Sequence, residues 1–172
     1  MIKIIFLCHG NICRSPMAEY VMKDLIRKRG LENEFEVTSG AVSDEEWFNP
    51  KYPPAQKKLH EKGISFGNHS AHKISIEEFN AQDLVIVMDQ SNLRWLRRIV
   101  GDFCSVDAGA PLKSSGIKGK VHLMMEFADS DSGSARDVAD PWYTGDFEQT
   151  YQDVLAGCNG LLNLLERSPE MN

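Results

Sequence analysis

Four stretches of the chain have the apolar pattern of β-strands. Residues 2–7 and 84–88 are almost continuously apolar, which is typical of parallel strands buried on both faces of a sheet. Residues 35–39 and 121–127 are predicted to form two further strands, although the methionine pair in the second makes its pattern less clear.

Helical patterns separate these strands. Ser15 and Pro16 favour a helix start, and an apolar stripe continues to Gly30, which favours its end. Further helices are predicted over residues 53–63, from Ser75, over 91–101 with Ser91 as the cap, and over 146–167. This alternation predicts an α/β fold in which helices cover both faces of a parallel sheet. Ligands of such folds bind beyond the carboxyl ends of the strands.

Length and composition indicate a single globular domain. A chain of 172 residues can bury roughly 70% of its unfolded surface, and we find neither a repeat nor a domain boundary, so residues 1–172 are expected to form one domain. The polar stretch 129–137 is predicted to be a mobile surface loop.

The charge and the apolar runs argue against two classes of partner. The net charge is −6 and no basic stripe dominates, so nucleic acid is not an expected partner. No apolar run approaches the ~18 residues of a membrane span, and residues 2–7 are too short for a signal-peptide core. We therefore expect a cytoplasmic protein without a membrane partner, whose four cysteines stay reduced; Cys104 and Cys158 are expected in the core.

The segment from Cys8 to Pro16, Cys-His-Gly-Asn-Ile-Cys-Arg-Ser-Pro, carries the candidate chemistry. It lies between the first predicted strand and helix, where successive backbone N–H groups can surround an anion; this phosphate loop would comprise His9, Gly10, Asn11, Ile12, Cys13 and Arg14. Gly10 and Asn11 are suited to positive φ angles. The positive field would keep Cys8 a thiolate, Arg14 would grip two phosphate oxygens, and Ser15 would place a hydroxyl near the sulfur. A bare Cys-x5-Arg spacing is weak, but its strand–loop–helix context favours this interpretation.

The same segment resembles the signature loop of the low-molecular-weight protein tyrosine phosphatases. The resemblance extends to Thr38-Ser-Gly40, to Val87-Met-Asp-Gln-Ser-Asn-Leu93 and to Asp140-Pro-Trp-Tyr143. It implies a single domain with a four-stranded parallel sheet, no metal or organic cofactor, and a monomer. It also implies Cys8 as nucleophile, Arg14 as phosphate ligand and Asp140 as general acid, with Asn11, Ser15, Ser39 and His72 supporting the loop.

Phosphotyrosine in a protein is the expected substrate and inorganic phosphate the product. Trp47, Trp142 and Tyr143 are candidate walls of a deep slot that admits a long phosphotyrosine, with packing as ordinary core the alternative. Ile12 favours phosphotyrosine, because family members acting on phosphoarginine carry Thr at that position. Asp137 is a competing candidate for the acid.

Several alternatives remain at the level of sequence. Cys13 is either a redox partner of Cys8 or a small buried residue. An arsenate reductase on this fold would need further cysteines, which residues 84–95 lack. A phosphate-binding module without turnover would be expected to lack the nucleophile or the acid. A metal site at His69 and His72 would need two more ligands.

Overall fold

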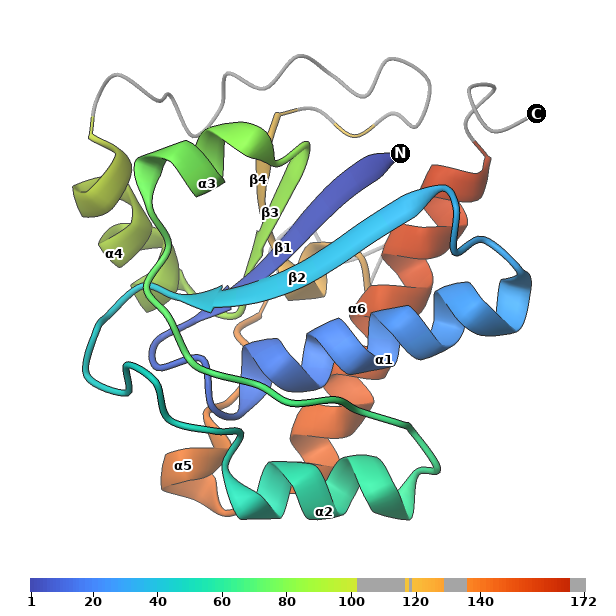
Figure 1. Ribbon diagram of the computed structural model, residues 1–172, viewed down its shortest axis with the longest axis horizontal. Coiled ribbons are helices and arrows are strands. Elements are labelled where there is room, and N and C mark those ends of the chain that lie inside the picture. The colour runs from blue at the N-terminus through green and yellow to red at the C-terminus, as the bar shows by residue number, and fades with distance from the viewer. Residues whose placement is uncertain (102–116, 118, 129–135, 168–172) are drawn as a thin grey trace.

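A four-stranded parallel sheet forms the centre of the protein. The computed structural model describes residues 1–101, 117, 119–128 and 136–167. Its strands are β1 (Ile2–Cys8), β2 (Phe35–Ala41), β3 (Leu84–Val87) and β4 (Val121–Leu123). They lie in the order β2-β1-β3-β4, so β1 is central, and every pairing is parallel (Figure 1). The predicted fold class is confirmed.

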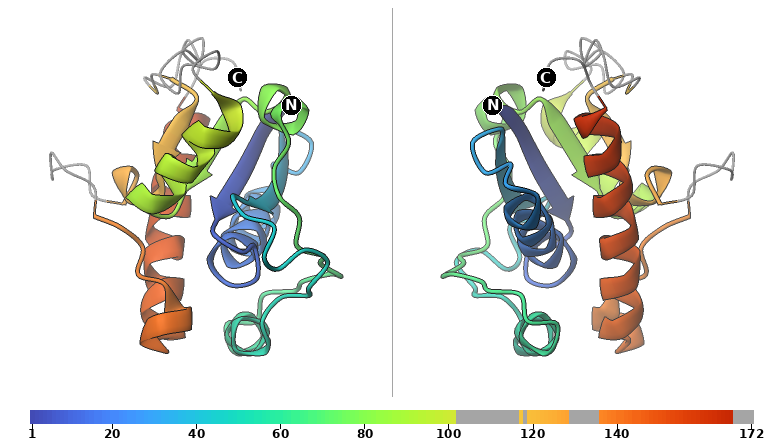
Figure 2. Two further views of the ribbon diagram at one scale, coloured as in Figure 1. Left: turned by 90° about the vertical axis from the view of Figure 1, so that its left-hand side faces the viewer. Right: turned by 90° about the vertical axis from the view of Figure 1, so that its right-hand side faces the viewer.

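Helices cover both faces of this sheet. In the described part of the chain they are α1 (Arg14–Arg29), α2 (Pro53–Glu61), α3 (Ile76–Ala81), α4 (Gln90–Val100), α5 (Pro141–Thr144) and α6 (Phe147–Glu166), with a short 3₁₀ turn η1 (Met124–Glu126). Alternate residues of β1 enter two separate hydrophobic clusters. Ile4 and Phe6 pack with α1 and α6, whereas Ile5 and Leu7 pack with α3 and α4. Figure 2 shows the ribbon of these helices and of the sheet from two further sides. Burial on both faces explains why β1 is almost continuously apolar.

Two predicted helix caps are wrong by two residues. Helix α1 begins at Arg14 after Cys13, and no side chain caps it, so Ser15 lies inside the first turn. Helix α4 begins at Gln90, because the Asp89 side chain rather than Ser91 accepts the hydrogen bond from the Asn92 N–H. Because α1 begins before Ser15, the Ser15 hydroxyl does not cap the helix and lies at the Cys8 sulfur instead.

The fourth strand is shorter than predicted. It ends at Leu123, and η1 occupies the next three residues. The Glu126 carboxylate turns back to accept from the Leu123 N–H at 2.9 Å, and Met124 packs closely against Gly157 of α6. A local side-chain bond and burial beneath a helix thus end the strand.

Two sequence expectations fall partly or wholly outside the described residues, namely Cys104 and most of the polar stretch 129–137. Cys158 is fully buried, as predicted. Within the described part of the chain, no helix combines the length and the apolar character that crossing a membrane would require.

Candidate active site

The loop that joins β1 to α1 turns around the Cys8 sulfur. Asn11 has a φ of 57°, as predicted, and its N–H points to the Cys8 Sγ at 3.3 Å. Gly10 does not have a positive φ, so that part of the prediction is wrong. Gly10 is needed for space instead, because a Cβ there would lie 2.9 Å from the Glu46 Cγ.

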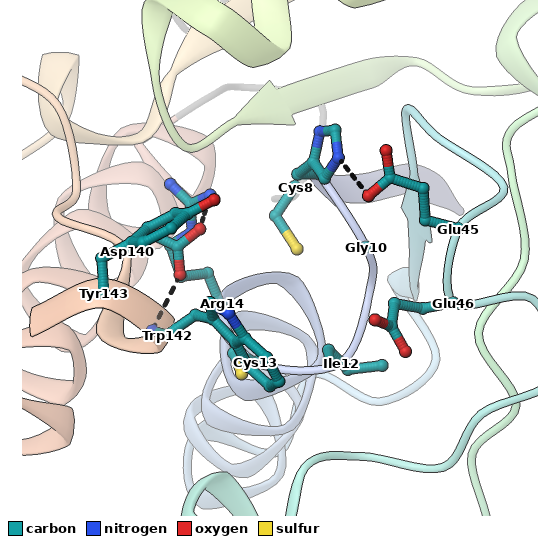
Figure 3. Close-up of a pocket in the computed structure, with 11 residues that line it drawn as sticks. Cys8, Gly10, Ile12, Cys13, Arg14, Glu45, Glu46, Asp140, Trp142 and Tyr143 are labelled. Carbon is teal, nitrogen blue, oxygen red and sulfur yellow. Dashed lines mark hydrogen bonds and ion pairs between the residues drawn. The ribbon is translucent and has the colours of Figure 1, made fainter. Parts of the chain in front are cut away.

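The Cys8 sulfur points into a cavity of about 280 Å³ at the carboxyl end of the sheet (Figure 3). The Ser15 Oγ lies 3.1 Å from it and 3.2 Å from the Gly40 carbonyl oxygen. The single hydroxyl proton of Ser15 can therefore be donated to either acceptor. Donation to sulfur would add a second hydrogen bond to the one from the Asn11 N–H.

The Arg14 guanidinium is buried beside this sulfur and held by two carboxylates. Its Nη1 donates to the Asp89 Oδ2 at 2.6 Å and to the Val138 carbonyl at 3.1 Å, and its Nη2 donates to the Asp140 Oδ2 at 2.8 Å. Burial alone would lower the pKa of Arg14, but the negative charges of Cys8, Asp140 and Asp89 outweigh it and raise that pKa. The guanidinium therefore stays charged.

Asp89 is a site residue that the sequence reasoning missed. Its other carboxylate oxygen accepts from the Asn92 N–H at 2.6 Å, so one side chain both caps α4 and orients Arg14. The available signal was its position two residues after the buried strand β3, at the sheet edge where ligands bind.

Asp140 lies on the cavity wall at the start of α5. Its Oδ1 accepts from the Trp142 N–H at 3.0 Å, which fixes the carboxylate, while Oδ2 faces Arg14. The competing candidate, Asp137, is engaged elsewhere and accepts from the Gln90 N–H at 3.0 Å. Asp140 lines the cavity with Cys8 and Arg14, and Asp137 is not among its lining residues.

Two of the three predicted aromatic walls lie at the cavity. Trp142 and Tyr143 line it, together with the loop residues His9, Gly10, Ile12 and Cys13. Trp47 does not; its ring packs beside Phe48, with ring centres 5.8 Å apart, and this part of the prediction is wrong. The neighbouring residues Glu45 and Glu46 line the cavity instead, and neither was among the predicted site residues.

A buried polar network supports the loop from below. The Asn11 Nδ2 donates to the Ser15 Oγ at 2.9 Å and to the Ser39 Oγ at 3.0 Å. Ser39 in turn donates to the Glu19 Oε2 at 2.6 Å. Three predicted supporting residues are thus brought together, and Glu19 of α1 is an addition.

The prediction chose the wrong histidine for this support. His72 contacts the Glu78 carboxylate at 3.0 Å, whereas the His69 Nε2 lies 2.7 Å from the Asn11 carbonyl oxygen and donates to it. Because each ring is bonded to a different partner, the two histidines do not form a pair of metal ligands. In the described residues, no group of three or more His, Cys, Asp or Glu side chains could hold a metal ion.

The two histidines are expected to give opposite pH effects on stability. Burial lowers the pKa of His69, so its stabilising contribution is present above about pH 6.5 and is lost as pH falls through the folded-state pKa. The hydrogen bond to Glu78 raises the pKa of His72, so its contribution is present below about pH 6.5 and is lost as pH rises through the folded-state pKa.

Urea unfolding at pH 5.5 and 7.5 tests this sign difference. His69→Ala should cost about 1 kcal/mol at the higher pH and less at the lower one. His72→Ala should cost more at the lower pH. The same pH trend in both variants would contradict the assigned contacts.

Cys13 lines the cavity but is a poor nucleophile. Burial raises the pKa of its thiol, and the negative charges of Cys8 and Asp140 add to this. Cys8 and Cys13 are both free thiols in the structure, so their redox pairing stays a prediction.

Comparison with known proteins extends the likeness over nearly the whole chain. Residues 3–170 match the family model for low molecular weight phosphotyrosine protein phosphatase. The low molecular weight protein-tyrosine-phosphatase YfkJ of Bacillus subtilis is 32% identical over 171 residues, which cover 99% of this chain and 100% of that protein.

Solved structures agree with the sequence match. The crystal structure of YfkJ superposes with a TM-score of 0.82 at 33% identity, over 96% of this chain and 95% of that one. The Drosophila arginine phosphatase DARP superposes with a TM-score of 0.78 at 25% identity, over 96% and 98% of the two chains. The protein is therefore a member of the low molecular weight phosphotyrosine protein phosphatase family.

Proposed function

We propose that this enzyme hydrolyses phosphotyrosine monoesters in protein substrates through a cysteinyl-phosphate intermediate. The observation that carries the proposal is one cavity lined by the Cys8 sulfur, the Arg14 guanidinium and the Asp140 carboxylate. Turnover of a phosphotyrosine peptide by the purified protein, with release of inorganic phosphate, is the direct test.

In the first step, the Cys8 thiolate attacks phosphorus in line with the tyrosyl oxygen. The S–P bond forms as the P–O bond to tyrosine breaks. The loop amides and Arg14 hold the equatorial oxygens, so most of the catalysis is positioning and charge stabilisation. Arg14 now donates to Asp140, so an incoming phosphate competes with that carboxylate for Nη2.

Asp140 handles the proton in both steps. As a carboxylic acid it protonates the departing tyrosyl oxygen, and as a carboxylate it then accepts a proton from the attacking water. Water attacks phosphorus, the S–P bond breaks, and phosphate leaves with the Cys8 thiolate restored.

Asp140→Asn is expected to affect substrates according to their leaving groups. Hydrolysis of phosphotyrosine should slow about 100-fold, because the phenolate then departs without a proton. An aryl phosphate with a strongly acidic leaving group should slow much less. Single-turnover rates on both substrates measure this, and equal losses would show that Asp140 is not the proton donor.

The substrate class depends on the cavity wall as well as on the chemistry. Ile12 presents an aliphatic side chain to the cavity, which supports phosphotyrosine over the phosphoarginine that the name of DARP indicates for that relative. Assays with matched phosphotyrosine and phosphoarginine peptides distinguish the two. A thioredoxin-coupled arsenate assay tests the reductase alternative.

The proposal includes three expectations about the protein as a whole. Residues 1–172 would act as one catalytic domain, as a monomer, in the cytoplasm. Light scattering of the purified protein and fractionation of the source cells test the last two.

A further inference from the structure

The cavity has two chemically different walls above the Cys8 sulfur. Asp140, Trp142 and Tyr143 form one wall, and Glu45 and Glu46 lie opposite them, across the sulfur (Figure 3). Both glutamates follow the carboxyl end of β2. Two carboxylates beside the binding site of a phosphate dianion repel that dianion, so their position at the cavity is not explained by phosphate binding.

The segment that carries these glutamates is bonded to the phosphate loop. The Val42 N–H donates to the Cys8 carbonyl at 3.0 Å, and the Ser43 N–H and hydroxyl both donate to the His9 carbonyl at 3.1 Å. The Glu46 side chain also packs against Gly10. The two carboxylates are therefore held at a fixed place relative to the nucleophile.

The charge of this wall is only partly balanced. Glu45 contacts the His9 Nε2 at 3.0 Å, and that ring is a cation only when protonated. Glu46 accepts from the Asn49 amide at 2.5 Å, a neutral partner that fixes the carboxylate and leaves its charge in place. Cys13 lines the same cavity, and burial is the main cause of its raised pKa. The negative charge of Glu46 adds to that increase, so the electrostatic field of Glu46 reaches into the cavity.

We propose that Glu45 and Glu46 select phosphotyrosine segments with a lysine or arginine beside the phosphotyrosine. The inference rests on the proposed function, because it places the phosphate at Cys8 and Arg14. The peptide must then cross the cavity rim, where a neighbouring cation is attracted to the two carboxylates and a neighbouring carboxylate is repelled. Trp142 and Tyr143 contact the tyrosyl ring, and Glu45 and Glu46 discriminate between charges on the adjacent residue.

Matched phosphotyrosine peptides test this selectivity. Each has a neutral background and carries Lys or Glu at one position, from three residues before to three after the phosphotyrosine. At its best position, Lys should give a kcat/KM about twofold to fivefold above Glu, in the range of exposed ion pairs, and the ratio should shrink in 0.5 M salt. Comparing peptides as a ratio cancels any effect of the carboxylates on the phosphate itself.

Variants of the same loop assign the preference to its residues. The double variant Glu45→Gln/Glu46→Gln keeps the side-chain size and should bring the Lys-to-Glu ratio close to one. Asp44→Asn is the matched control, because Asp44 is paired with Lys73 at 3.7 Å and is not a cavity-lining residue; it should leave the ratio unchanged.

Each outcome has a distinct meaning. The inference would be overturned if the wild-type Lys-to-Glu ratio of kcat/KM were one. It would also be overturned if that ratio were unchanged in the double variant, or if it fell equally in Asp44→Asn. In all three cases the peptides are still hydrolysed. Failure to hydrolyse any of the peptides would instead overturn the proposed function and with it this inference.

Discussion

Cys8→Ser is expected to abolish hydrolysis of phosphotyrosine peptides, with a loss in kcat on the order of 10⁴-fold or more. A serine hydroxyl is almost wholly protonated at neutral pH and is a much weaker nucleophile than a thiolate. The substitution changes one atom and leaves the loop amides and Arg14 in place. Binding of inorganic phosphate should therefore persist, as titration calorimetry can measure.

A second cysteine provides the matched control for this prediction. Cys158 is a free thiol buried in the core beneath α1, where its sulfur lies 3.8 Å from the Ala18 carbonyl oxygen. Cys158→Ala should retain the wild-type kcat, with only a modest loss of stability. Turnover near the native rate in Cys8→Ser would rule out the cysteinyl-phosphate mechanism.

Arg14→Ala is expected to reduce kcat/KM by ~10²–10⁴-fold. The guanidinium can donate two charge-assisted hydrogen bonds to phosphate oxygens, each worth about 1.5–3 kcal/mol, and their sum corresponds to that range of rates. The same side chain separates Asp89 from Asp140. Its removal leaves two neighbouring carboxylates without their cation, so the thermal midpoint should fall as well.

The conservative variant distinguishes geometry from charge. Arg14→Lys keeps the positive charge but replaces the planar two-nitrogen fork with a single nitrogen, which cannot bind two phosphate oxygens side by side while still holding Asp89, so it should recover only a small part of the lost rate. Stopped assays on a phosphotyrosine peptide, with circular dichroism as a check of folding, measure both variants. A loss of less than tenfold in Arg14→Ala would contradict its role as the phosphate ligand.

Sequence reasoning worked best where function and fold are encoded by neighbouring residues. The strand, the loop and the helix from residue 2 to Gly30 were predicted from burial pattern, turn chemistry and a helix stop, and the structure has them in that order. The choice of Asp140 over Asp137 rested on the backbone constraint of the Asp140-Pro141 pair and on the family motif, and the structure places Asp140 at the cavity. The two-residue error at the start of α4 arose because Asp89 caps that helix in place of Ser91, and the error at α1 arose because no side chain caps that helix.

Contacts between distant segments were predicted less well. His69 and His72 are three residues apart, so composition and spacing could not decide which one would meet the Asn11 carbonyl. Trp47 was favoured as a wall because it is aromatic, yet the turn after β2 directs Glu45 and Glu46 into the cavity instead. In each case the result depends on how one irregular segment packs against the phosphate loop.

The sequence by itself determined the parallel α/β fold and a thiol–guanidinium loop at the end of its first strand. Local periodicity and backbone preferences are sufficient for these, because the residues concerned are adjacent along the chain. Only the tertiary structure decided that Asp89 and Asp140 hold Arg14, that Glu19 anchors Ser39, and that an acidic wall faces an aromatic one. Asp89 and the two glutamates of the acidic wall lie near the loop because parallel pairing brings the carboxyl ends of β1, β2 and β3 to one edge of the sheet, and no local sequence pattern encodes that proximity.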